Sequence, residues 1–96
     1  MKNIPKSIKI FGHTYKIYIR KDLILNEIPC AGYVHLIERK IYLNKALPLE
    51  ARWEVLIHEV FHGLISELEI NIDDGTEEIL VNHSSKLAWQ IMQKSK

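Results

Sequence analysis

Two histidines and a glutamate in the middle of the chain have the residue types and spacing of a metal-dependent hydrolytic site. The five residues from His58 to His62 read HEVFH, which fits the pattern H-E-x-x-H. On a helix, side chains four positions apart lie on the same face, so His58 and His62 can bind one metal ion. Glu59 points away from that ion but can reach a water molecule beside it. The motif therefore predicts a zinc site with Glu59 as general base.

The residues around the motif predict an amphipathic helix from about Leu49 to Leu68. His58 and His62 lie to one side of its apolar face, so packing in a core does not explain them. The alternative reading is a pair of partly exposed helix histidines with Glu59 as a surface charge, and the helical context favours the metal site. The apolar face consists of Leu49, Trp53, Leu56, Ile57, Val60, Leu64 and Leu68.

A catalytic zinc ion takes about three protein ligands, so a third ligand must lie outside the motif. In one large class of zinc hydrolases it is a glutamate on a downstream helix, and the predicted helix that starts at Glu77 is the one downstream helix here. Glu78 is the first choice, because Asn82 follows one turn later and could hold Glu78 or a ligand histidine by a hydrogen bond. Glu77 lies nearer the centre of that helix's apolar stripe and is the alternative. Further alternatives are His35, His83, Asp73 and Asp74.

Many sites of this type add a tyrosine or histidine that donates a hydrogen bond to the tetrahedral intermediate. The candidates in this chain are His35, Tyr33, Tyr42 and His83. Each also has a purely structural explanation, because strand aromatics usually pack and His83 fits a solvent-facing helix position.

The rest of the sequence predicts an α+β domain built on a small sheet of three or four strands. Alternating apolar residues in 7–20, with Gly12-His13 between them, indicate a hairpin. Residues 31–37 and 40–44 predict two more strands. Residues 21–29 lack clean periodicity and fit either a short strand or an apolar loop.

A second helix is predicted from Glu77 to about Gln93, capped by Asp74 or Thr76. Its apolar residues form a stripe that can pack on the first helix or on the sheet; they are Leu80, Val81, Leu87, Ala88, Ile91 and Met92. The predicted fold is a single α+β domain of residues 1–96, in which the sheet packs on the HExxH helix and a second, C-terminal helix.

Composition narrows the function classes. Hydrophobic residues make up 47% and charged residues 26% of the chain, as in an ordinary soluble domain. The net charge of +1, with acids and bases interleaved, predicts neither a nucleic-acid partner nor a membrane surface. Cys30 is the only cysteine, which a reducing cytosol permits. No signal-peptide or membrane-spanning run is found, so we expect a cytoplasmic protein.

Two longer segments carry a family resemblance. The sequence HEVFHGL starting at His58, followed by EEILVN starting at Glu77, resembles the minimal zincin-like proteins of phages and prophages. These proteins are similar to the ImmA/IrrE-type metallopeptidases. The resemblance covers about residues 32–92, and HExxH is its one highly specific motif. The segment LAWQIM, residues 87–92, is similar to the end of the same helix in the small phage proteins.

The resemblance implies a gluzincin-like zinc site with His58, His62 and Glu78 as ligands and Glu59 as catalytic acid/base. The expected function is a zinc-dependent metallopeptidase whose peptide or protein substrate lies along a sheet edge, at strand 33–37 or strand 40–44. The alternative is a zinc-stabilised, non-catalytic binding or scaffold module. A complete ligand set with Glu59 favours the enzyme, whereas the small size favours the module.

Overall fold

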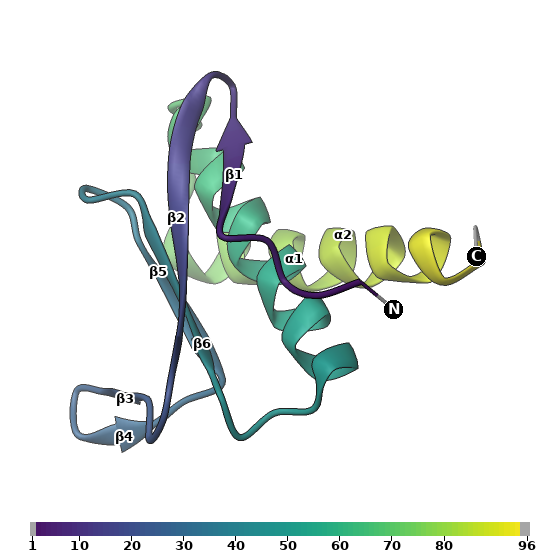
Figure 1. The fold of residues 1–96 in the computed structure, drawn as a ribbon. Helices are drawn as coiled ribbons and strands as arrows, with labels where there is room; N and C mark the ends of the chain where they lie inside the picture. The colour runs from purple at the N-terminus through teal and green to yellow at the C-terminus, as the bar shows by residue number, and fades with distance from the viewer. Residues whose placement is uncertain (1, 95–96) are drawn as a thin grey trace.

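Four strands form one mixed sheet, and both helices lie on the same side of it (Figure 1). The computed structural model describes residues 2–94. The sheet has the strand order β1-β2-β6-β5, in which β2 and β6 are parallel and the other neighbours are antiparallel. An α+β fold with a sheet of three or four strands was predicted, and this is confirmed. The strands are β1 (Ser7–Ile10), β2 (His13–Arg20), β5 (Gly32–His35) and β6 (Lys40–Asn44).

The stretch from 21 to 29, for which the sequence left strand or loop open, forms a separate two-stranded hairpin. Its strands are β3 (Ile24–Leu25) and β4 (Ile28–Pro29). Asn26 and Glu27 between them have φ of 52° and 65°. Tight two-residue hairpin loops need this left-handed backbone at both positions.

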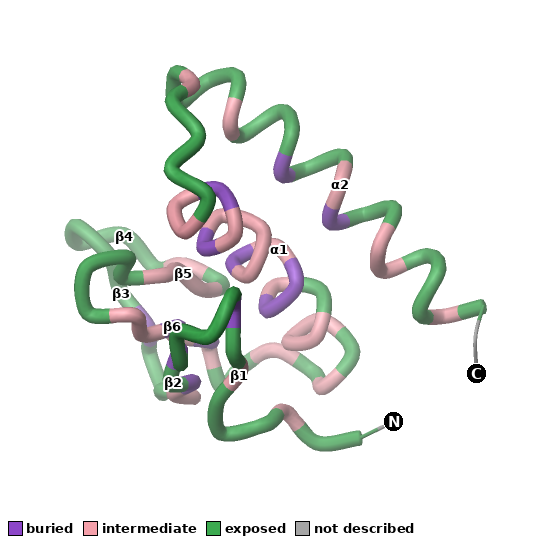
Figure 2. Tube along the Cα trace, turned by 90° about the horizontal axis from the view of Figure 1, so that it is seen from above, coloured by how far each residue is buried: buried purple, intermediate pink, exposed green. Residues whose placement is uncertain are grey.

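The first helix, α1 (Leu49–Glu67), lies across one face of the sheet and closes the core (Figure 2). Strand side chains alternate between the two faces, so every second residue points toward α1. Gly63 is buried in this contact, and a Cβ there would lie 2.9 Å from Cδ1 of Ile10. The buried core cluster consists of Ile10, Tyr15, Ile17, Ile41, Leu43 and Leu56.

Glu67 ties the last turn of α1 to the sheet. Its carboxylate accepts hydrogen bonds from the Tyr15 hydroxyl and from Nε of Arg39, the latter at 2.8 Å. Arg39 and Tyr15 together lower the pKa of Glu67 to about 2. Burial, and then the hydrogen bond to Glu67, raise the pKa of Tyr15 to about 12. These contacts fix the direction in which α1 crosses the sheet.

The second helix, α2 (Asp74–Lys94), contacts α1 but none of the strands. Among its described residues only Val81 and Ser85 are buried (Figure 2). The prediction of the apolar stripe is therefore only partly correct: the packed face follows positions 77, 81, 85 and 88, and of these Val81 and Ala88 belong to the stripe. On this face Glu77 contacts His62 of α1. Four stripe residues are exposed, namely Leu80, Leu87, Ile91 and Met92.

Asp73 caps α2, whereas the sequence pointed to Asp74 or Thr76. Oδ1 of Asp73 accepts a hydrogen bond from the Thr76 backbone N–H at 2.8 Å, and Oδ2 accepts one from the Thr76 hydroxyl at 2.7 Å. These bonds lower the pKa of the Asp73 carboxyl. The helix therefore begins about one turn before Glu77, and Glu77 and Glu78 both lie inside α2. Over residues 2–94, neither helix is long and apolar enough to cross a membrane.

Candidate metal centre

The imidazoles of His58 and His62 meet the carboxylate of Glu78 where α2 crosses α1. The two Nε2 atoms of the histidines lie 3.2 Å apart. Oε1 of Glu78 lies 3.2 Å from Nε2 of His58, and Oε2 of Glu78 lies 3.2 Å from Nε2 of His62. One ligand atom from each residue can therefore reach a common point. The structure brings together the three residues that the sequence selected.

These separations fit the donor set of a zinc ion. Zinc–nitrogen bonds of 2.0–2.1 Å in a tetrahedral site separate neighbouring ligand atoms by about 3.3 Å. Two imidazole nitrogens and one carboxylate are also the ligand types of catalytic zinc, with a fourth position left for water or substrate. We conclude that the residues present fit a zinc ion.

Glu77, the alternative third ligand, contacts the opposite side of one histidine. Its Oε2 lies 2.7 Å from Nδ1 of His62. An ionised carboxylate only accepts hydrogen bonds, so a hydrogen bond between these two atoms is donated by Nδ1 of His62. In that arrangement Nε2 of His62 is the nitrogen left for a metal, and Glu77 would orient the ring.

The environment of His58 keeps its imidazole in the ligand form. Burial, and then the neighbouring His62, lower the pKa of His58, and Glu78 opposes this effect. The net direction is downward, so His58 is neutral at physiological pH. A neutral imidazole is the form that coordinates metals.

Glu59 is buried beside the ligands, with 8% of its surface exposed. Burial raises the pKa of its carboxyl to about 7; Glu78 acts in the same direction, while His62 and a backbone hydrogen bond with Val34 act against it. Val34 belongs to β5, so Glu59 sits between α1 and the edge of the sheet. A carboxyl whose pKa lies near 7 can both take up and release a proton at neutral pH.

A pocket of about 320 Å³ opens beside His58 and Glu59, between α1, α2 and β5. Gly32 lets β5 approach α1 closely: a Cβ there would lie 2.6 Å from Cγ1 of Val55 and 2.7 Å from the carbonyl oxygen of Tyr42. The sequence analysis did not predict that α2 lines this pocket. The lining residues of α2 lie on one helix face with Glu78, and their spacing of three or four residues could have indicated this; they are Asn82, Ser85, Lys86 and Trp89.

The candidates for stabilising a tetrahedral intermediate lie elsewhere. Tyr33 and Tyr42 stack on each other on the sheet face away from α1, with ring centroids 4.9 Å apart. Nδ1 of His35 accepts a hydrogen bond from the Glu38 backbone at 3.2 Å. Nδ1 of His83 lies 2.8 Å from the backbone oxygen of Ile79, on an exposed part of α2. The pocket beside the candidate centre is lined by none of the four.

Two acids at the start of α2 and Asn82 lie outside the cluster of ligand atoms. Asp73 caps α2 and Asp74 starts it, and neither belongs to the histidine cluster. Within residues 2–94, the Asn82 side chain makes no hydrogen bond to Glu78 or to either ligand histidine, and it lines the pocket instead.

A scan of protein-family models, a search of curated proteins and a search of solved structures each give no match to this chain. The chemistry of the site therefore rests on its own geometry.

Proposed function

We propose that the protein is a zinc-dependent metallopeptidase with a zincin-like fold, and that His58, His62 and Glu78 hold the metal. The observation that carries the proposal is the cluster of His58, His62 and Glu78, in which one ligand atom from each residue lies within 4.8 Å of the other two. The sequence resemblance to ImmA/IrrE-type metallopeptidases points in the same direction.

The roles of the other residues follow from their surroundings. When bound, zinc polarises a substrate carbonyl and acidifies a water molecule in the same site. Glu59, buried beside the ligands, would take a proton from water as the water oxygen adds to the carbonyl carbon, and would pass that proton to the leaving amine as the C–N bond breaks. Asn82 and Lys86 bring N–H donors to the pocket wall and are the side chains available to hold the substrate's carbonyl oxygen.

The edge strand β5 is the part of the sheet that can receive a substrate. Strand β6 is flanked by β2 and β5, so the proposed strand 40–44 has no free edge. Strand β5 is paired on one side only and lies next to Glu59 through Val34. An extended peptide can therefore add to β5 by backbone hydrogen bonds, with one side chain in the neighbouring pocket.

One observation supports a second candidate function, a binding module in which the metal has a structural role. Among the helices and strands of residues 2–94, α2 packs against α1, so a metal bound between them would hold the two helices together. In that case the protein is a zinc-stabilised binding module, and Glu59 has no chemical role.

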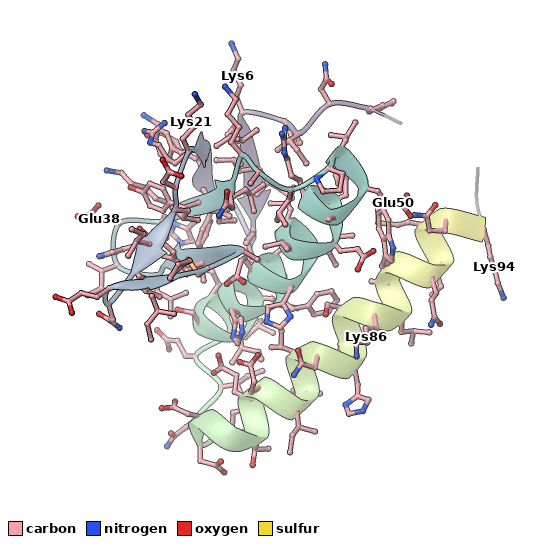
Figure 3. All side chains as sticks on the ribbon, turned by 90° about the horizontal axis from the view of Figure 1, so that it is seen from below. Lys6, Lys21, Glu38, Glu50, Lys86 and Lys94 are labelled. Carbon is pink, nitrogen blue, oxygen red and sulfur yellow. The ribbon has the colours of Figure 1, made fainter. Side chains whose placement is uncertain are left out.

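Zinc content and peptide cleavage, measured on wild type and on Glu59→Gln, separate the two functions. We expect both proteins to bind zinc. Wild type should cleave members of a random peptide library, and Glu59→Gln should lose at least about 100-fold in rate, the usual contribution of a general base. Glu50→Gln is the matched control, because it makes the same chemical change on an exposed turn of α1 near the end of α2 (Figure 3).

Equal cleavage by wild type and Glu59→Gln would show that Glu59 is not the base. A zinc-loaded wild type that cleaves no library member would favour the binding module.

A further inference from the structure

The charges of this protein are segregated between its two halves. Residues 1–46, which form the strands, carry nine Lys and Arg against three Asp and Glu, a net charge of +6. Residues 47–96, which form the helices, carry four against nine, a net charge of −5. The overall value of +1 hides this division, so charge that looked interleaved along the sequence is polarised in space.

Four of the nine Lys and Arg residues of this half lie in the strands of the sheet, on the face away from the helices, which we call the outer face. The four strands of the sheet contain no Asp or Glu. Their cationic residues alternate with core residues and so all point outward. They are Lys9, Lys16, Arg20 and Lys40.

Two of these lysines are direct neighbours. Lys16 of β2 is paired in register with Lys40 of β6, in the middle of the sheet. Like charges opposite each other on a sheet face are destabilising. Lys40 forms an ion pair with Glu38, whose carboxylate lies 3.2 Å from Nζ of Lys40 and is about half exposed. An exposed pair of this kind offsets little of the repulsion, so the lysine row leaves positive charge for an external anion.

A row of tyrosines runs beside the lysine row. Tyr18, Tyr42 and Tyr33 are in register across three strands. The Tyr18 and Tyr42 ring centroids lie 5.4 Å apart, those of Tyr42 and Tyr33 lie 4.9 Å apart, and both pairs are stacked. Arg20 lies 4.8 Å above the Tyr18 ring. The rings therefore cover one another's faces.

We propose that the outer face binds an acidic polypeptide segment of a partner protein, with Lys16, Lys40 and Arg20 contacting its carboxylates. Tyrosine edges and hydroxyls beside the lysines supply apolar contact and hydrogen bonds, the combination that recurs in protein interfaces. Both helices lie on the other side of the sheet, so this binding is independent of the metal centre (Figure 3).

The aromatic geometry favours a polypeptide over a nucleic acid. Surfaces that bind single-stranded nucleic acid combine cations with aromatic faces on which bases stack. The Tyr42 ring has a tyrosine on either side, and Tyr18 carries Arg20. With these faces covered, the row offers hydrogen-bonding edges, which suit carboxylates.

The test measures fluorescence anisotropy of a labelled glutamate-rich peptide with the full-length protein at low salt. The variant Lys16→Gln/Lys40→Gln removes the lysine row. The control Lys2→Gln/Lys94→Gln makes the same change in charge at two exposed positions outside the sheet and the pocket. A labelled oligothymidylate of equal charge is the second probe, and sedimentation of the protein alone reports self-association.

We expect the peptide to bind wild type, with affinity that falls as salt is added, and to bind Lys16→Gln/Lys40→Gln about tenfold more weakly. The control should bind like wild type. Removal of like-charged neighbours should leave the melting temperature of Lys16→Gln/Lys40→Gln at least equal to that of wild type, so weaker binding is not unfolding. The proposal is overturned if both variants bind equally or if wild type does not bind. It is also overturned if oligothymidylate binds more tightly than the peptide, or if the face proves to mediate self-association that Lys16→Gln/Lys40→Gln abolishes.

Discussion

The two adjacent glutamates at the start of α2 contact different atoms of the same cluster. Glu78 reaches Nε2 of both histidines, and Glu77 reaches Nδ1 of His62. The sequence predicted that an acid from this turn meets the HExxH helix. It could not give Glu77 its role, because one residue of rotation decides which nitrogen each carboxylate meets. That rotation depends on how α2 packs on α1.

Substitution of each glutamate should separate the ligand from the residue that orients it. Glu78→Ala removes a ligand atom, so we expect the larger loss of zinc affinity. Glu77→Ala should weaken zinc binding by about 10- to 100-fold, the usual effect of losing the partner of a ligand histidine. Competition with a chelator of known affinity measures both. Tighter zinc retention by Glu78→Ala than by Glu77→Ala would reverse the assignment.

The buried carboxyl of Glu59 should make the zinc-free protein sensitive to pH. The folded-state pKa of about 7 lies above the ordinary 4.5, so folding favours the protonated form. Stability from this group is full below about pH 4.5 and is lost as the pH rises through about 7. Glu59→Gln should therefore be more stable than wild type by about 2–3 kcal/mol at pH 8, with the difference shrinking toward pH 4. Urea unfolding of both proteins across this range measures it, and a gap that does not change with pH would contradict the assignment.

At the scale of elements, the sequence predicted where the strands and helices lie better than it predicted which face of each helix is buried. The period-two pattern located the strands of the sheet, since alternation reports directly which residues face a core. The apolar stripe of α2 was partly misleading, because Leu80 and Leu87 remain exposed while Val81 of the same stripe is buried. Hydrophobicity identifies a buried helix face only where apolar surface drives the contact, and here Glu77 and Glu78 also meet the histidines of α1.

Gly32 shows how closely β5 must approach α1. A Cβ at this position would meet Val55 and the Tyr42 backbone at less than 3 Å, and backbone yields little. We expect Gly32→Ala to destabilise the protein by about 1–3 kcal/mol in thermal unfolding, the usual cost of overpacking. The control Gly75→Ala, in the first turn of α2 with its nearest neighbour at 3.3 Å, should have little effect. Equal stability of the two variants would contradict the close approach.

At the scale of the whole molecule, the protein consists of three layers: the sheet, α1 and α2 (Figure 1). The core lies between the first two layers, and α2 adds few buried side chains. The sequence could not reveal this imbalance, because α2 has enough apolar residues for a packed helix. The candidate metal centre joins α2 to α1.

Zinc removal should therefore loosen α2 before it affects the sheet. A ligand that binds only the folded state adds about 4 kcal/mol of stability at a concentration 1,000 times its dissociation constant, and the proposed zinc ion would act in this way. We expect chelation to raise amide hydrogen exchange in α2, with β2 and β6 remaining protected. Glu78→Ala should show the same pattern without chelator. Uniform loss of protection across the whole chain would show that α2 and the sheet unfold as one unit.

The parallel pairing of β2 with β6 also bears on the order of folding events. Residues 7–20 and 32–44 each form a local hairpin, whereas Lys16 and Lys40 come together only after the intervening loop closes. Local hairpins form in microseconds, and non-local pairings are slower. Joining the hairpins is therefore expected to limit the folding rate, with α2 docking afterwards. A metal that binds after this step slows unfolding and leaves the folding rate nearly unchanged, so zinc would increase the kinetic stability of the folded protein.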